Sequence, residues 1–328
     1  MLYRDLGKTG LSVSVITFGC GPTGGGVLSG TSKDQEKLVG RALELGINVF
    51  DTAAIYGQGQ SEQNLGSALT KLKAEPIIAS KVALEIHDLT DIQQSVITSV
   101  ESSLKRLKVE SIDLIQLHNR VGKERAEKAN IGVGAQLTVE DVLGHNGVID
   151  AFATLRKQGK VKATGFTGFG GTASEVYKLI DSGQFDTINV LFNLLNRSAF
   201  TEYDAPHSSE DTENNDFQGV GFRAVGSDMG VLGIRVLAAG NLINFSQTKG
   251  SDLTKFKKMK LRQVLNRIAS TRESELPISS IRFVLSNLGI SSQVIGLSNI
   301  SQIESAILAL EQGTFSENEY SSILNSDI

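Results

Sequence analysis

Short apolar runs alternate with segments of helical periodicity along most of the chain. The runs are rich in Val, Ile, Leu and Phe and end at turn-forming residues, which is typical of buried strands. Strands that alternate with helices pair in parallel, because each helix returns the chain to the edge where the next strand begins. We predict eight strands, at residues 15–18, 48–51, 76–80, 111–117, 161–166, 187–192, 232–237 and 293–297.

The segments between these strands predict helices. The first has a capping signal, because Ser32 and Gln35 have the spacing of a capping box. We expect helices at 33–45, 61–70, 91–107, 147–158, 173–181, 254–270, 277–288 and 300–310. Eight such units in 328 residues favour an α/β fold, a closed (β/α)8 TIM barrel that occupies residues 1–328 as one domain.

Three segments stand outside this repeat. Residues 2–14 contain Gly7-Lys8-Thr9-Gly10 between two short extended pieces, which predicts a hairpin across the barrel floor. Two long polar insertions, at about 119–146 and 198–228, follow the fourth and sixth strands. Loops of this length are usually functional or disordered. Because both leave the carboxyl ends of strands, we expect them to overhang the face where barrel enzymes carry their active sites.

Composition excludes several classes of function. A net charge of −4 provides no basic surface for nucleic acid, and no apolar run approaches the roughly 20 residues of a membrane span. Cys20 is the only cysteine, so we expect a cytoplasmic protein without an intrachain disulfide. No His or Cys spacing indicates a metal site. The sequence gives no indication of the oligomeric state.

One motif is misleading. The segment Gly19–Gly24 matches the G-x-G-x-x-G pattern after a strand. A Rossmann fingerprint requires a helix to begin at that turn, with its N-terminus at the pyrophosphate. Here Pro22 and three glycines intervene, and the capping signal comes only at Ser32. We interpret the segment as a loop at the barrel mouth, where Gly21 lets a flat ligand approach the backbone.

Four polar residues fall at equivalent places along the repeat. Asp51, Lys81 and His118 each follow a short apolar run, and Tyr56 follows Asp51 by one short loop. Each has a structural interpretation when taken alone, since a lone histidine is more often structural than catalytic and a lone lysine is usually solvated. Their joint placement at successive strand ends favours a catalytic site instead.

These four side chains have the properties that carbonyl reduction requires. A phenol has a pKa of about 10, and a neighbouring ammonium lowers it toward neutral pH. A carboxylate beside the lysine holds the ammonium charged, and an imidazole can orient the substrate oxygen. The set therefore predicts proton transfer to or from a carbonyl oxygen.

The chain resembles the aldo-keto reductase superfamily from about residue 2 to residue 310. Its matching segments, in the order and spacing of that family, are Tyr3–Leu11, Gly46–Ala53, Tyr56-Gly57, Ser80-Lys81, Ser103–Leu107, Asp113–His118, Gly159–Val161 and Asn193–Arg197. The resemblance implies a (β/α)8 barrel that binds an extended nicotinamide cofactor without a Rossmann domain. It also implies Tyr56 as the proton donor, Lys81 and Asp51 as its tuning pair and His118 as the orienting residue.

The cofactor positions match the family less well. The family usually has Ser-Asn where this chain has Thr167-Gly168, Gln where it has Asn189, and a stacking Tyr where it has Ile234. The cofactor contacts that the resemblance implies are Gly21, Asp51, Thr167, Gly168, Asn189, Ile234, Arg235, Leu237, Gly240, Gly296, Ser298 and Gln302.

The late loop bears on the choice between NAD and NADP. Residues 294–310 contain no Lys or Arg, whereas a 2′-phosphate requires a cationic partner. Arg235 could substitute if it faced the pyrophosphate or ribose, or it could pair with a carboxylate. We therefore expect NAD, or use of both cofactors.

The expected substrate is a small polar carbonyl compound or a sugar. The segment Gly233–Gly240 resembles a branch that contains sugar 1-dehydrogenases, such as those for L-galactose and L-fucose. The chain has no Trp and only 6% aromatic residues, which argues against a pocket for a large apolar molecule. A second hypothesis is a regulatory subunit of the same fold, which would bind the cofactor as a redox sensor with slow turnover.

Overall fold

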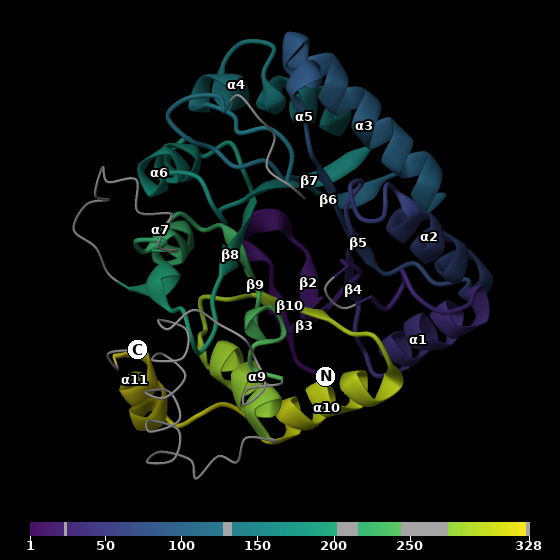
Figure 1. Ribbon diagram of the computed structural model, residues 1–328, viewed down its shortest axis with the longest axis vertical. Coiled ribbons are helices and arrows are strands. Elements are labelled where there is room, and N and C mark those ends of the chain that lie inside the picture. The colour runs from purple at the N-terminus through teal and green to yellow at the C-terminus, as the bar shows by residue number, and fades with distance from the viewer. Residues whose placement is uncertain (23–24, 127–132, 202–215, 244–274, 326–328) are drawn as a thin grey trace.

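Eight parallel strands close into a barrel in the order β10-β3-β4-β5-β6-β7-β8-β9 (Figure 1). The computed structural model describes residues 1–22, 25–126, 133–201, 216–243 and 275–325. This arrangement confirms the predicted TIM barrel. The strands are β3 Ile16–Gly19, β4 Val49–Asp51, β5 Ile77–Val82, β6 Ile112–Leu117, β7 Val161–Thr167, β8 Thr187–Leu191, β9 Gly230–Ile234 and β10 Ser292–Gly296.

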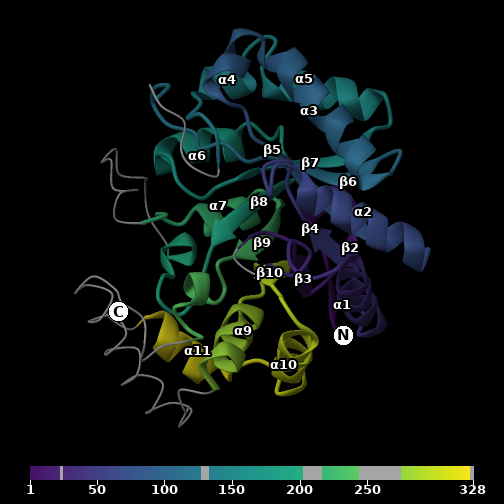
Figure 2. The ribbon, with the colours of Figure 1, turned by 45° about the vertical axis from the view of Figure 1, so that its right-hand side comes forward.

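Helices surround the barrel on its outer side (Figures 1 and 2). None of the described helices is both long and apolar enough to cross a membrane. The predicted helix at 254–270 lies outside the described residues. The helices are α1 Ser32–Glu44, α2 Gln60–Leu72, α3 Ile92–Leu107, α4 Val139–Leu143, α5 Val148–Lys157, α6 Ala173–Asp181, α7 Val220–Gly226, α9 Leu276–Ser286, α10 Ile300–Glu311 and α11 Glu317–Leu324.

The alternation of side chains along the strands divides the core in two. Residues on the outer face, such as Phe50 and Ile115, pack beneath the helices in one large buried cluster. Residues on the inner face are smaller and fill the barrel itself. The inner cluster consists of Leu6, Val13, Val49, Ala79, Leu114, Ala163 and Leu232.

An antiparallel hairpin closes the floor of the barrel, as the sequence predicted. It consists of β1 Tyr3–Asp5 and β2 Ser12–Ser14. The turn between them meets the amino end of β9, where the backbone N–H of Lys8 donates to the carbonyl of Asp228 at 3.2 Å. A Cβ on Gly7 would lie 2.2 Å from the Gly230 nitrogen, so only glycine fits there. The floor is thereby sealed, and the opposite, carboxyl end stays available for a site.

Two local predictions were wrong. The capping box of α1 is formed by Thr31 and Asp34, one residue earlier than the predicted Ser32 and Gln35. The seventh barrel strand ends at Ile234 rather than at residue 237. It ends there because Arg235 has a left-handed φ of 58°, which an extended strand cannot contain.

The insertions contain helices that the sequence patterns did not reveal. Helix α4 lies within 119–146, and α7 lies within the described part of 198–228. The first insertion returns to the barrel mouth, where Val121 forms parallel bridges with Leu137 and Gly171. Helix α1 begins at Ser32 and not at the glycine turn that follows β3, where a Rossmann fingerprint would require it. Residues 23–24 of the G-x-G-x-x-G segment lie outside the described residues.

Candidate active site

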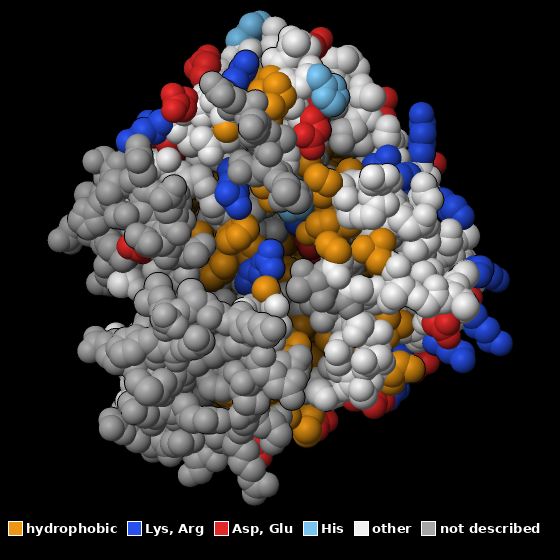
Figure 3. Space-filling view, viewed as in Figure 1, with side chains coloured by type: hydrophobic (Ala, Val, Ile, Leu, Met, Phe, Trp, Pro, Cys, Tyr) orange, Lys and Arg blue, Asp and Glu red, His pale blue; other side chains and the backbone are white. Residues whose placement is uncertain are grey.

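A cavity of about 430 Å³ lies at the carboxyl end of the barrel. Figure 3 shows a hollow at the centre of this face, with hydrophobic and charged side chains around it. A volume of this size is typical of small-molecule sites. Many of its lining residues are at or near the ends of barrel strands, among them Gly19, Asp51, Lys81, Thr167, Ile234 and Gly296.

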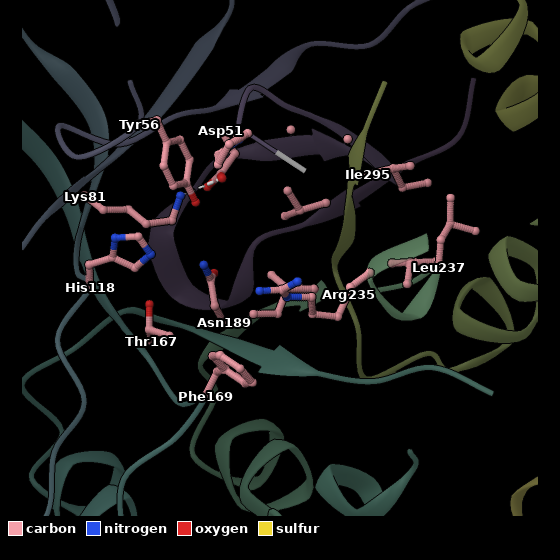
Figure 4. Close-up of a pocket in the computed structure, with 18 of the residues that line it drawn as sticks. Asp51, Tyr56, Lys81, His118, Thr167, Phe169, Asn189, Arg235, Leu237 and Ile295 are labelled. Atoms are coloured by element: carbon pink, nitrogen blue, oxygen red, sulfur yellow. Dashed lines mark hydrogen bonds and ion pairs between the residues drawn. The ribbon is translucent and has the colours of Figure 1, made fainter. Parts of the chain in front are cut away.

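The structure brings the four predicted residues together in this cavity (Figure 4). Asp51 ends β4, and Lys81 lies on β5 two residues beyond Ala79, which is the register partner of Asp51. His118 directly follows β6, and its backbone N–H donates to the carbonyl of Val82. Side chains two residues apart on a strand point to the same side, so this register directs all three into the barrel.

Lys81 and Asp51 form a buried ion pair. Lys81 Nζ lies 2.6 Å from Asp51 Oδ1, and the two side chains are only 3% and 5% exposed. The same ammonium donates a second hydrogen bond to the Thr52 carbonyl oxygen at 2.8 Å. Desolvating each ion costs several kcal/mol, a cost that close pairing and a further hydrogen bond offset. The second carboxylate oxygen, Asp51 Oδ2, is buried without a hydrogen-bond partner among the described residues.

The ion pair favours a charged lysine. Burial alone would lower the pKa of Lys81, but the carboxylate of Asp51 and the phenol of Tyr56 outweigh burial and raise that pKa above its ordinary 10.5. Burial raises the pKa of the Asp51 carboxyl, and the ammonium opposes the rise. Because the ammonium directly faces one oxygen of the carboxylate, we assign both groups as charged near neutral pH.

The phenol of Tyr56 lies beside this pair. Lys81 Nζ is 5.2 Å from the centre of the Tyr56 ring. Burial raises the pKa of the Tyr56 phenol above 10, whereas Lys81 acts to lower it. The effect of the ammonium has the expected direction, but burial outweighs it. Gly21 packs against the ring, since a Cβ there would lie 3.2 Å from Tyr56 Cε2.

His118 is held neutral beside the phenol. Its ring meets that of Tyr56 edge to face, with centroids 5.7 Å apart. Burial, and to a lesser degree the charge of Lys81, lowers the pKa of His118 to about 3. Its Nδ1 is buried without a hydrogen-bond partner among the described residues. A neutral imidazole carries one N–H, so the ring can donate one hydrogen bond and accept another.

Polar groups also line the wall opposite Tyr56. The side-chain amides of Gln116 and Asn189 bond each other reciprocally, at 2.9 and 3.0 Å. Each amide retains one N–H and one lone pair after this exchange. Thr167 Oγ1 is buried and has no hydrogen-bond partner among the described residues. In the part of the chain that the structure covers, no cluster of three or more His, Cys, Asp or Glu side chains could hold a metal.

Most of the predicted cofactor contacts line the cavity, and three lie outside it. A Cβ on Gly168 would lie 2.6 Å from Ile188 Cδ1, so this glycine permits close packing behind the wall. Ser298 is exposed, and its N–H and hydroxyl donate to Gln302 Oε1. The contacts that line the cavity are Gly21, Asp51, Thr167, Asn189, Ile234, Arg235, Leu237, Gly240 and Gly296.

Sequence reasoning missed several lining residues. Arg120 and Phe169 both line the cavity. Each lies two positions beyond a predicted site residue, Arg120 beyond His118 and Phe169 beyond Thr167. Extending the two-residue alternation past the strand ends would have found both. Val236 has the same signal, since it lies two positions beyond Ile234, and Ile295 lies on β10 itself. Val133 and Ile243 carry no such signal, because they lie in loops.

The shifted pKa of His118 predicts a pH-dependent stability. Between its ordinary value of 6.5 and its folded value of about 3, the unfolded chain binds a proton that the folded protein does not. The free energy of unfolding therefore falls as the pH decreases through this window. Between pH 6.5 and pH 5, we expect the free energy of unfolding of the wild type to fall by about 2 kcal/mol more than that of His118→Asn. Urea denaturation at each pH measures the difference.

A matched control is His87→Asn, because the His87 side chain is 83% exposed. The free energy of unfolding of the His87→Asn variant should fall, as the pH decreases, in parallel with that of the wild type. Equal pH dependence of the wild type and His118→Asn would contradict a buried neutral imidazole.

Comparison with known proteins identifies the family. The model of the Aldo/keto reductase family matches residues 15–327. The L-galactose dehydrogenase of Arabidopsis thaliana is 25% identical over 332 residues, which cover 96% of this chain and 92% of that protein. The aldo-keto reductase YhdN of Bacillus subtilis is 35% identical over 125 residues, or 36% of this chain and 38% of YhdN.

Solved structures show the same fold. The holo form of aldo-keto reductase AKR11C1 from Bacillus halodurans superimposes with a TM-score of 0.74 at 22% identity, covering 100% of this chain and 97% of that one. The barrel, the cavity at its carboxyl end and the family match over residues 15–327 agree. The chain therefore belongs to the aldo/keto reductase family of nicotinamide-dependent oxidoreductases.

Proposed function

We propose that this protein reduces a small polar carbonyl compound to its alcohol, or catalyses the reverse oxidation of an alcohol or sugar. We propose also that Tyr56 transfers the proton. Members of the family use nicotinamide cofactors and act on small carbonyl or sugar substrates. The observation that carries the proposal is the buried pair of Lys81 and Asp51 beside the Tyr56 ring, inside a cavity of suitable size.

The four residues divide the work of proton transfer. In reduction the Tyr56 phenol donates its proton to the substrate oxygen, and in oxidation the phenolate accepts the proton from the alcohol. The Lys81 ammonium stabilises the phenolate, and Asp51 keeps that ammonium charged and in place. Neutral His118 orients the substrate oxygen by a hydrogen bond. The bound cofactor supplies or accepts the hydride.

The polar wall fits a carboxamide. The buried Thr167 hydroxyl has no hydrogen-bond partner among the described residues, and the amide of Asn189 keeps one N–H and one lone pair after pairing with Gln116. A nicotinamide carboxamide offers both a donor and an acceptor to such groups. We therefore assign Thr167 and Asn189 to the carboxamide. Ile234 then lies where it can pack against the pyridine ring.

The late loop favours NAD, or use of both cofactors. Residues 294–310 contain no Lys or Arg. Arg41 of α1 reaches α10 but is already held by Glu44 and Glu304, at 3.2 and 3.0 Å. Arg235 points toward Asn189 and away from Leu237 and Ile295 (Figure 4). Of the described arginines, neither Arg41 nor Arg235 is therefore placed to bind a 2′-phosphate near the late loop.

An aldose is our preferred substrate class. The similarity to an L-galactose dehydrogenase extends over 96% of this chain. Tyr56 and His118 both line the cavity, and each can form a hydrogen bond to a sugar hydroxyl. Oxidation of a sugar would use Tyr56 as the base.

Substituting Tyr56→Phe tests the proton-transfer role. We expect kcat to fall by about a hundredfold or more, with the Kd of the cofactor changed less than threefold, because the variant removes only the hydroxyl. Turnover is followed by nicotinamide absorbance, with reduced cofactor and small aldehydes in one direction and oxidised cofactor and aldoses in the other. Cofactor binding is followed by fluorescence.

Tyr3→Phe is the matched control, since Tyr3 is half exposed on the floor hairpin. It should keep full turnover. Unchanged turnover in Tyr56→Phe would remove the phenol from the mechanism. A wild-type protein that binds cofactor without turning over any substrate would favour the sensor hypothesis instead.

Cofactor preference provides a separate test. Because the late loop lacks a cation, we expect the wild type to bind NADH at least as tightly as NADPH, or within about tenfold of it. Fluorescence titration of the same preparation with both reduced cofactors measures the ratio. A Kd for NADPH a hundredfold below that for NADH would contradict this prediction.

A further inference from the structure

Two arginines converge on one aromatic ring at the cavity wall. Arg120 follows β6, and Arg235 follows β9. The central guanidinium carbons of Arg120 and Arg235 lie 5.9 and 5.8 Å from the centre of the Phe169 ring. All three residues line the cavity. The ring therefore holds two positive charges from different loops beside the same space. We call Arg120 and Arg235 the arginine pair.

Neither guanidinium of the arginine pair is neutralised by the described part of the protein. No ion pair or hydrogen bond to either guanidinium is present among those residues, and Arg120 Nε is buried without a partner. Other arginines of the chain contrast with them, since Arg106 pairs with Glu62 and Arg223 pairs with Asp181. A partly buried N–H without a partner costs free energy, which a bound oxyanion would recover.

The arginine pair belongs to the catalytic end of the cavity. Arg120 lies two residues after His118. Arg235 points toward Asn189 rather than toward Ile295 (Figure 4), and its charge acts on the Tyr56 phenol. A substrate whose oxygen meets Tyr56 and His118 would extend toward these guanidinium groups. The 2′-phosphate of a bound NADP is on the adenosine, at the opposite end of the cofactor from the nicotinamide. It would therefore lie far from the reacting atoms and from these two arginines.

We propose that the arginine pair binds a carboxylate or phosphate group of the substrate, so that the enzyme acts on an anionic carbonyl compound or sugar. This inference rests on the proposed function and narrows its substrate class. Planar guanidinium groups bind both kinds of oxyanion through paired N–H donors. Contact with the Phe169 ring holds both guanidinium groups at the cavity wall before any ligand binds.

Paired substrates that differ in one charged group test the inference. The pairs are succinic semialdehyde with butanal, glyceraldehyde 3-phosphate with glyceraldehyde, and galacturonate with galactose. We expect kcat/KM of the wild type to favour at least one anionic member by tenfold or more. Arg120→Gln should lower kcat/KM for that member by about ten- to a hundredfold, mainly through KM, and leave the neutral member within about twofold.

Two further variants serve as controls. Arg120→Lys keeps the charge without the planar donors and should restore part of the loss. Arg223→Gln changes an arginine that also lies over an aromatic ring, 5.6 Å from the centre of Tyr177, but outside the cavity. Arg223→Gln should leave kcat/KM unchanged for both the charged and the neutral member of each pair. An equal loss for charged and neutral members in Arg120→Gln would overturn the inference.

Binding of simple anions separates this inference from the proposed function. Calorimetric titration of the protein with succinate and with inorganic phosphate needs no turnover, and it distinguishes a carboxylate site from a phosphate site. We expect the Kd of the preferred anion to rise about tenfold in Arg120→Gln. An unchanged Kd for both anions would overturn the inference, as would weaker NADH binding with unchanged substrate selectivity. Absence of turnover on every pair would count against the proposed function alone.

Discussion

The ion pair between Lys81 and Asp51 is the interaction on which the rest of the site depends. Both charges are almost completely buried, so removing either would leave the other uncompensated at a cost of several kcal/mol. The pair forms only if β4 and β5 are neighbours in the register that aligns Asp51 with Ala79. The strand pairing that builds this part of the barrel therefore also places the two buried charges.

Polar contacts fix β5 on both of its faces. Lys81 points inward to Asp51, while its neighbour Ser80 points outward and donates to Glu62 Oε1 at 2.5 Å. Glu62 is itself fully buried and accepts from Arg106 Nε at 2.6 Å. A strand anchored on both faces cannot easily rotate or slip, because a one-residue slip would exchange its faces. The lysine is thereby held beside the phenol before any ligand binds, as preorganised catalysis requires.

The sequence predicted the barrel and the four central residues because both depend on local patterns. Short apolar runs, helical periodicity, strand ends and residue chemistry can all be recognised along the chain. It misplaced the α1 cap because Thr31-Asp34 and Ser32-Gln35 offer similar spacing, and only the backbone geometry decides between them. The end of β9 depends on the left-handed conformation of Arg235. The sequence does not indicate this conformation, because the residue at that position is not a glycine. The two-residue alternation would have placed Arg120 and Phe169 at the cavity. The contact of both arginines with the Phe169 ring, however, depends on how three loops meet, which a linear pattern does not encode.

The most direct test of the central claim is the pH dependence of alcohol oxidation in Lys81→Met. If the ammonium stabilises the Tyr56 phenolate, the apparent pKa of the catalytic base should rise by about one unit or more and kcat should fall. The double variant Lys81→Met/Asp51→Asn removes both buried charges, so it should show a smaller rise in the same direction, because the Asp51 carboxylate no longer raises the pKa of Tyr56. It also avoids the instability of an unpaired carboxylate. An unchanged pH profile in folded protein of either variant would contradict the account.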